Sequence, residues 1–139
     1  MDDIEAITRL KARYCRLMDT KDWAGFRHVF TDDVTMDSTG AGGVVIRGGD
    51  EFLRFIMVAL DNVVTVHHCH MPEIDIMSPT TATGIWAMED MVRFPDGRDL
   101  HAYGHYHETY EKMDGEWRIK SSVLTRLRTD FVRTPEATL

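Results

Sequence analysis

Histidines gather in one short segment of the chain, where His67, His68 and His70 flank Cys69. If this segment is a strand, successive side chains point to opposite faces, so His67 and Cys69 share one face. An imidazole titrates near neutral pH and is therefore a natural general base when it faces a pocket. We expect at least one of these histidines to face the concave side of a sheet. Each histidine taken singly also fits a surface or a subunit interface.

Asp19 and Tyr14 are candidates on the first predicted helix. Asp19 follows the end of the apolar stripe, near the negative end of the helix dipole, and the small residues Ala12 and Cys15 leave space beside it. Tyr14 lies on the buried stripe, where its hydroxyl needs a hydrogen-bond partner. Spacing alone favours an exposed turn aspartate and a core tyrosine bonded to a backbone carbonyl.

Another carboxylate, Asp90, shares one face of a predicted strand with Trp86 and Met88. Burial of that face would raise the pKa of Asp90 and let it act as an acid or a hydrogen-bond donor. If the opposite face is the inner one, Asp90 instead lies in water. Arg126, near the end of the last predicted strand, suits an anionic group or a carboxylate, although a surface arginine is the default.

Two His-x-His pairs allow a different chemistry. His68 with His70, and His105 with His107, could bind zinc or iron if both pairs faced one cavity. Nothing in the spacing fixes the pairs on facing strands, and outward-facing polar residues at a subunit interface explain them equally. The sequence has no Walker motif, dinucleotide fingerprint or Cys-x-x-Cys. We predict no metal and no cofactor, with a metal-dependent enzyme that uses the His-x-His pairs as the first alternative.

The elements that would position these residues run in the order helices first, long strands afterwards. Apolar residues recur at helical spacing from Ile4 to Met18, and Asp22 can cap a second short helix that carries Trp23 to Phe30. The segment Thr31-Asp32-Asp33 is predicted to break the pattern. The remaining predictions are short strands at 34–37 and 44–46 around a glycine loop at 40–43, a helix at 50–60, and long strands at 63–76, 82–94, 98–112 and 117–128, joined by turns at 95–97 and 113–115.

This order predicts an α+β fold in which a strongly curved antiparallel sheet wraps around the N-terminal helices as a cone. Such a sheet leaves a concave pocket under its helices, and that pocket is the natural ligand site. The 139 residues suit one domain, at 1–132, followed by a C-terminal tail at 133–139.

Composition excludes several classes of partner. The net charge of −7 argues against binding a nucleic-acid backbone, and no apolar run approaches the roughly 20 residues that span a membrane. The start Met1-Asp2-Asp3 is acidic, unlike a signal peptide, and the two cysteines suit reduced thiols. We therefore expect a cytoplasmic protein.

An ordered series of segments resembles SnoaL-like domains of the nuclear transport factor 2-like superfamily. The resemblance runs from about Asp3 to Arg128. Within the superfamily the chain is most similar to bile-acid 7-alpha-dehydratases and more distantly to scytalone dehydratases and hexachlorocyclohexane dehydrochlorinases. The segments that carry the resemblance are Arg13 to Asp19, Asp22-Trp23, Phe30 to Val34, Val66-His67-His68, Pro72-Glu73-Ile74, Thr81 to Gly84, Trp86 with Glu89-Asp90, and Tyr106 to Ile119.

The resemblance implies a cone-shaped α+β barrel and a cofactor-free lyase that acts on a hydrophobic polycyclic or steroid-like molecule. The catalytic dyad falls on His67 and Asp19, with Tyr14 as helper. It also implies a homo-oligomer, a trimer or a dimer. The family contains isomerases, polyketide cyclases and non-catalytic binding or accessory subunits, which remain alternatives. The predicted substrate-binding residues are Asp90, Trp86, Arg126 and Tyr106, while segments 38–47 and 97–105 depart from the dehydratase pattern and leave the substrate open.

Overall fold

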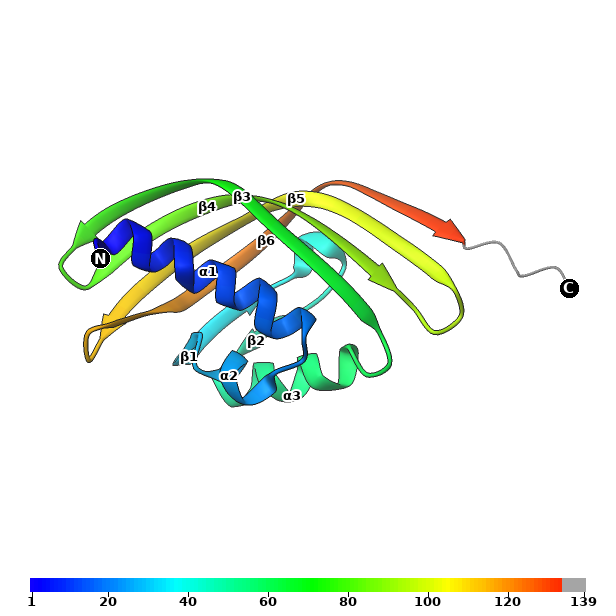
Figure 1. The fold of residues 1–139 in the computed structure, drawn as a ribbon, viewed down its shortest axis with the longest axis horizontal. Coiled ribbons are helices and arrows are strands. Elements are labelled where there is room, and N and C mark those ends of the chain that lie inside the picture. The colour runs from blue at the N-terminus through cyan, green and yellow to red at the C-terminus, as the bar shows by residue number, and fades with distance from the viewer. Residues whose placement is uncertain (134–139) are drawn as a thin grey trace, which may run out of the picture.

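A curved sheet arches over three helices in the computed structural model, which describes residues 1–133 (Figure 1). The helices lie along the concave side of the sheet, with α1 running beneath the long strands. This arrangement confirms the predicted α+β class. The elements are α1 (Asp3–Asp19), α2 (Trp23–Arg27), β1 (Phe30–Asp37), the 3-10 helix η1 (Thr39–Ala41), β2 (Val45–Arg47), α3 (Gly49–Ala59), β3 (Val64–Ser78), β4 (Thr81–Arg93), β5 (Arg98–Met113) and β6 (Glu116–Arg133).

Side-chain caps fix the starts of the first two helices. Asp2 accepts a hydrogen bond from the backbone N–H of Glu5, and Asp22 accepts one from Gly25. The predicted second helix was too long, because α2 ends at Arg27 and Phe30 already pairs with Ile119 of β6.

The predicted break at residues 31–33 is likewise wrong, since these residues belong to β1. Their acidic side chains point outward and are neutralised there. Asp32 lies 2.7 Å from Arg27, and Asp33 pairs with Lys120.

The strand order is β2-β1-β6-β5-β4-β3. All neighbouring strands are antiparallel except β1 and β6, which are parallel, a pairing that the sequence did not indicate. Among the described residues β2 and β3 remain as edges, so the cone is open. The last strand continues to Arg133, the first residue of the predicted tail; the rest of that tail lies outside the described residues.

Alternation along the long strands decides which side chains face the helices. On β4 the buried positions include Trp86, Met88 and Asp90, and on β5 they include Tyr106 and Glu108. The pairing of β3 with β4 shifts between His70 and Glu73, around Pro72.

Aromatic rings pack between the helices and the first strand. The ring centroids of Phe26 and Phe30 lie 5.0 Å apart, and those of Phe30 and Phe52 lie 5.2 Å apart. Tyr14 joins this group at 5.5 Å from Phe26. The cluster fills the narrow part of the cone and leaves the space beside it open as a cavity.

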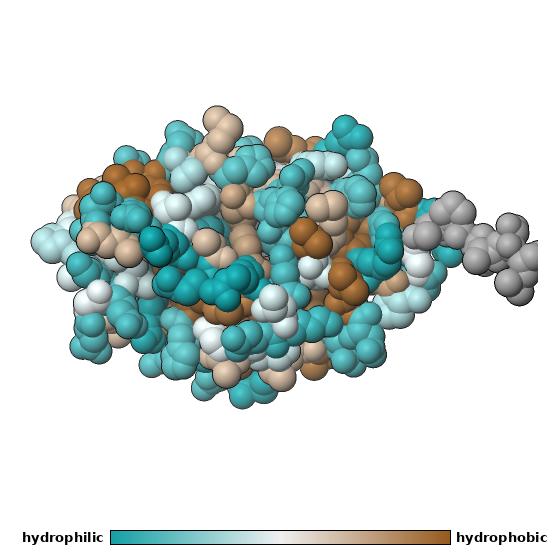
Figure 2. Space-filling model, in the orientation of Figure 1, coloured by the Kyte–Doolittle hydropathy of each residue, from teal (hydrophilic) through white to brown (hydrophobic). Residues whose placement is uncertain are grey.

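The surface turned toward the viewer in Figure 2 is mostly hydrophilic, with separate hydrophobic groups. Over the described residues, none of the helices combines the length and the apolarity that crossing a lipid bilayer requires.

Candidate active site

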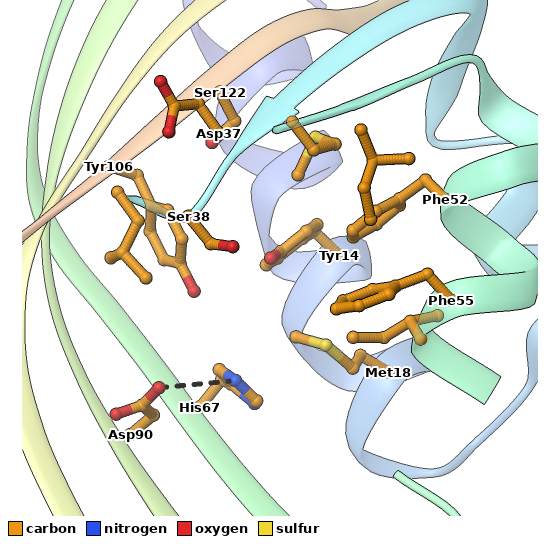
Figure 3. Close-up of a pocket in the computed structure, with 14 residues that line it drawn as sticks. Tyr14, Met18, Asp37, Ser38, Phe52, Phe55, His67, Asp90, Tyr106 and Ser122 are labelled. Atoms are coloured by element: carbon orange, nitrogen blue, oxygen red, sulfur yellow. Dashed lines mark ion pairs between the residues drawn. The ribbon is translucent and has the colours of Figure 1, made fainter. Parts of the chain in front are cut away.

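A cavity opens between α1, α3 and the concave face of the sheet (Figure 3). It holds about 150 Å³ of space, or about 610 Å³ when the part open to solvent is included. Its lining is mainly apolar, and Tyr14 from α1 lies across it from His67, Asp90 and Tyr106, which come from three different strands. The lining residues are Tyr14, Met18, Met36, Asp37, Ser38, Ile46, Phe52, Phe55, Ile56, His67, Asp90, Tyr106, Ser122 and Leu124.

Asp19, the last residue of α1, binds three donors on β3. Its carboxylate oxygens lie 2.7 Å from His67 Nδ1, 2.8 Å from the backbone nitrogen of His67 and 2.8 Å from Thr65 Oγ1. Because an ionised carboxylate only accepts hydrogen bonds, Nδ1 is the donor in this contact, and in the neutral imidazole Nε2 is then the nitrogen that carries the lone pair. The side chain of Asp19 is 20 % exposed, so it is not the free turn aspartate that spacing alone favoured.

The other imidazole nitrogen faces a second carboxylate. His67 Nε2 lies 3.8 Å from Asp90 Oδ2, drawn as the dashed line in Figure 3. This distance is too long for a direct hydrogen bond. Asp90 is buried and lies 3.3 and 3.4 Å from the two terminal nitrogens of Arg126. Asp90 therefore has a cationic partner instead of standing alone on an apolar face.

Two tyrosine rings form another wall of the cavity. Tyr14 from α1 and Tyr106 from β5 are both buried, with ring centroids 5.7 Å apart and planes nearly perpendicular. Burial raises the pKa of each hydroxyl well above 10.0; the neighbouring Tyr106 hydroxyl works in the opposite direction on Tyr14. Both phenols therefore stay protonated and can donate hydrogen bonds into the cavity at neutral pH.

These raised pKa values predict an alkaline limit to stability. Burial also raises the pKa of Tyr110. In the unfolded chain a tyrosine ionises near pH 10, before these three do in the folded chain, so the free energy of unfolding should be unaffected below about pH 10 and fall above it. Urea unfolding from about pH 8 to about pH 11, with phenolate absorbance followed in parallel, tests this. Ionisation of all four tyrosines while the circular dichroism remains native would contradict it.

Beneath the tyrosines lies a buried ion pair that the sequence analysis missed. Lys11 Nζ lies 2.8 Å from Glu108 Oε2, and the two side chains are 1 % and 0 % exposed. The same ammonium lies 3.7 Å from the centroid of the Tyr14 ring and 3.8 Å from that of Tyr106. A lysine on the buried stripe, one turn before Tyr14, was the available signal.

Glu108 has further donors around it. Ser122 Oγ and the Tyr110 hydroxyl each donate to it at 2.8 Å, and Trp86 Nε1 donates to Tyr110 at 2.9 Å. This network fixes the position of the Lys11 ammonium, which contacts the rings of both Tyr14 and Tyr106.

A family model for SnoaL-like domains matches residues 1–123. The chain belongs to the SnoaL-like domain family. The predicted membership is thereby confirmed, while the narrower likeness to bile-acid 7-alpha-dehydratases stays a prediction.

Similar proteins extend the comparison. The SnoaL-like chain is 28% identical over 137 residues to Probable cyclase FGR4 of Gibberella zeae, covering 87% of this chain and 89% of that one. A scytalone dehydratase-like protein from Novosphingobium aromaticivorans has the same fold, with a TM-score of 0.85 and 24% identity over 97% of this chain and 91% of the other. So does hexachlorocyclohexane dehydrochlorinase LinA-type3 from Novosphingobium barchaimii, with a TM-score of 0.82 and 15% identity over 97% and 93% of the two chains.

Not every predicted substrate-binding residue of this SnoaL-like domain borders the cavity. Asp90 and Tyr106 do, whereas Arg126 lies behind Asp90. Trp86 shares the inner face with Asp90 as expected but lies four residues before it on β4, where its indole nitrogen donates to the Tyr110 hydroxyl. Trp86 therefore belongs to the buried network and does not border this cavity, and its role in substrate binding stays a prediction.

The His-x-His pairs lie away from the cavity. His68 and His70 alternate with the inward-facing His67 and Cys69, and His105 and His107 alternate with the buried Tyr106. Strand β4 separates the two pairs, since His70 is level with Ala87 and Ala87 with His105. Within residues 1–133 no three His, Cys, Asp or Glu side chains cluster as metal ligands. The geometry therefore favours the outward-facing interpretation of these pairs.

Proposed function

We propose that this SnoaL-like protein is a lyase that eliminates water from a hydrophobic cyclic hydroxy ketone. One observation carries the proposal: Asp19 holds His67 by Nδ1 at 2.7 Å while the opposite nitrogen faces a mainly apolar cavity. This is the arrangement of a general base with an orienting carboxylate. The similarity to proteins named as a cyclase and a dehydrochlorinase supports an enzymatic role.

The proposed reaction uses side chains alone. His67 Nε2 removes a proton from the carbon next to the carbonyl, and Asp19 stabilises the imidazolium that forms. The C–O bond of the β-hydroxyl then breaks, and the hydroxyl leaves as water with the proton that the imidazolium returns, which restores the base. Tyr14 donates a hydrogen bond to the developing oxyanion or to the leaving hydroxyl, and Tyr106 is placed to donate a second one. Asp90, paired with Arg126, adds negative charge near the imidazolium.

The size of the cavity suggests how a polycyclic substrate would bind. The 150 Å³ space is close to that of an apolar cavity of about 150 Å³ known to hold a benzene ring. This volume is smaller than the roughly 300–1,000 Å³ of ordinary ligand pockets, so the enclosed space suits one ring and not a whole polycyclic molecule. We propose that the reacting ring enters beside His67 and that the rest of the substrate stays at the mouth, against Phe55 and Leu124.

Turnover of hydroxy ketones by an Asp19→Asn variant tests the proposal. A panel of hydrophobic β-hydroxy ketones, from single rings to steroids, is followed by the ultraviolet absorbance of the conjugated product. The variant should lower kcat by about 10²-fold, because the amide no longer stabilises an imidazolium. Asp75→Asn removes an exposed carboxylate on β3, the strand that carries His67; it is the matched control and should retain the parental rate. Parental turnover by Asp19→Asn would refute the dyad.

A cyclase is the second candidate, and the likeness to the Gibberella zeae protein favours it. Proton removal by His67 would again come first, but the carbanion would attack a carbonyl group of the same molecule. Such ring closure keeps every atom of the substrate, whereas elimination loses one water. The mass of the product therefore separates the two functions.

A further inference from the structure

The chain has two cysteines, and the fold brings them together. Cys15 lies on α1 and Cys69 on β3, 54 residues apart in the sequence, yet their sulfur atoms are 3.5 Å apart. Both residues are half-buried and free. The two sulfur atoms are therefore in contact across the interface between α1 and β3.

The thiol pair lies directly beside the proposed dyad. Cys15 precedes Asp19 by one helical turn, and Cys69 follows His67 by two residues on the same face of β3. The contact between the thiols is thus the neighbour, along the interface of α1 with β3, of the contact between Asp19 and His67. The proposed elimination uses neither sulfur.

Small oxidants have a route to these sulfurs. Cys15 and Cys69 border a surface pocket of about 450 Å³ that is distinct from the substrate cavity, although His67 borders both. Residues of α1, β3 and β4 line this pocket, so a molecule the size of a peroxide can reach the thiols without passing the substrate.

The two sulfurs differ in character. The hydrogen bond with Cys69 lowers the pKa of Cys15, and the same contact raises the pKa of Cys69. The charge of Lys11, one turn earlier on α1, also lowers the pKa of Cys15. Cys15 is therefore the sulfur that becomes a thiolate more readily, and thiolates are the nucleophiles in sulfur oxidation.

We propose that Cys15 and Cys69 form a redox-active pair that a peroxide converts to an intramolecular disulfide between α1 and β3. The sulfurs must approach by about 1.5 Å to reach bonding distance. Once formed, the bond clamps the end of α1 that carries Asp19 against the strand that carries His67. The pair is a modification site, independent of which molecule the cavity binds.

The chemistry balances in two steps. The Cys15 thiolate attacks one peroxide oxygen, so that an S–O bond forms, the O–O bond breaks and hydroxide leaves to become water, giving a sulfenic acid. The Cys69 sulfur then attacks the Cys15 sulfur, the S–S bond forms, the S–O bond breaks, and the departing hydroxide takes the Cys69 proton as water. The two thiols lose two electrons in total, and hydrogen peroxide is reduced to two molecules of water.

Mass spectrometry of the full-length protein tests the proposal. The reduced protein is treated with hydrogen peroxide and then with iodoacetamide. We expect the intact mass to fall by two hydrogen atoms with no alkylation, and a non-reduced digest to join the peptides that contain Cys15 and Cys69. Dithiothreitol should restore two alkylatable thiols. Cys15→Ser and Cys69→Ser are the controls, and neither should form the internal cross-link.

A rate comparison ties the cross-link to the fold. In urea the two sulfurs are separated by a flexible loop, so native protein should form the bond at least about 10-fold faster than unfolded protein. Two alkylated thiols after peroxide, separate oxidation of each sulfur without cross-linking, or an equal rate in urea would each overturn the proposal. Because the readout is mass, the result does not depend on the proposed lyase activity.

Discussion

Replacing His67 with glutamine should lower kcat for the elimination by about 10³–10⁴-fold while leaving the chain folded. Glutamine keeps a polar side chain that can donate to Asp19, but it has no basic nitrogen to accept the substrate proton. The ring is 9 % exposed, so water has little access to take over as base. Turnover of the best hydroxy ketone in the panel, measured at saturating concentration, gives the comparison.

His68→Gln is the matched control for this variant. It changes the same residue type one position along β3, where the side chain points to the outer face and is 57 % exposed. Its kcat should stay within about twofold of the parent, since surface substitutions on a stable fold have small effects. Equal losses in both variants, or parental activity in His67→Gln, would show that His67 is not the base.

Lys11→Met should destabilise the protein by about 3–5 kcal/mol. Methionine fills a similar volume, but it leaves the buried carboxylate of Glu108 without its cation. The remaining donors, Ser122 and Tyr110, are neutral and cannot balance a full charge. Urea or guanidinium unfolding at pH 7 measures the loss, with circular dichroism to confirm that the variant still folds.

The double variant Lys11→Met with Glu108→Gln separates charge from packing. Removing both charges eliminates the uncompensated carboxylate, so the double variant should be more stable than Lys11→Met alone. The sum of the two single effects should therefore exceed the effect of the pair. If the free energy of unfolding of Lys11→Met lies within about 1 kcal/mol of the parental value, the ion pair does not stabilise the fold as expected.

Local patterns predicted most of the elements and part of the site. Strand alternation placed His67 and Cys69 on one face, and the family resemblance paired His67 with Asp19. Spacing alone pointed the other way for Asp19, because a carboxylate at a helix end is normally solvated. Only the packing of α1 against β3 provides the three donors that hold it.

The buried network required information that one segment does not contain. Lys11 lies on the apolar stripe of α1, and Glu108 shares a face of β5 with Tyr106 and Tyr110, so each is a charged residue at a position where an apolar one is expected. Their pairing spans 97 residues and depends on how α1 crosses the sheet. The distance of Trp86 from the cavity could not be predicted for the same reason, since alternation gives the face of a strand but not the position along it.

The hydrogen bond from the backbone nitrogen of His67 to Asp19 has a consequence for self-association. β3 is an edge strand, and unpaired amides along such an edge are templates for strand addition between molecules. Asp19 occupies one of these amides at 2.8 Å, as a neighbouring carbonyl would. The carboxylate that is proposed to orient the imidazole therefore also occupies an amide that a neighbouring strand would need, so loss of Asp19 should expose this edge to pairing as well as lower turnover.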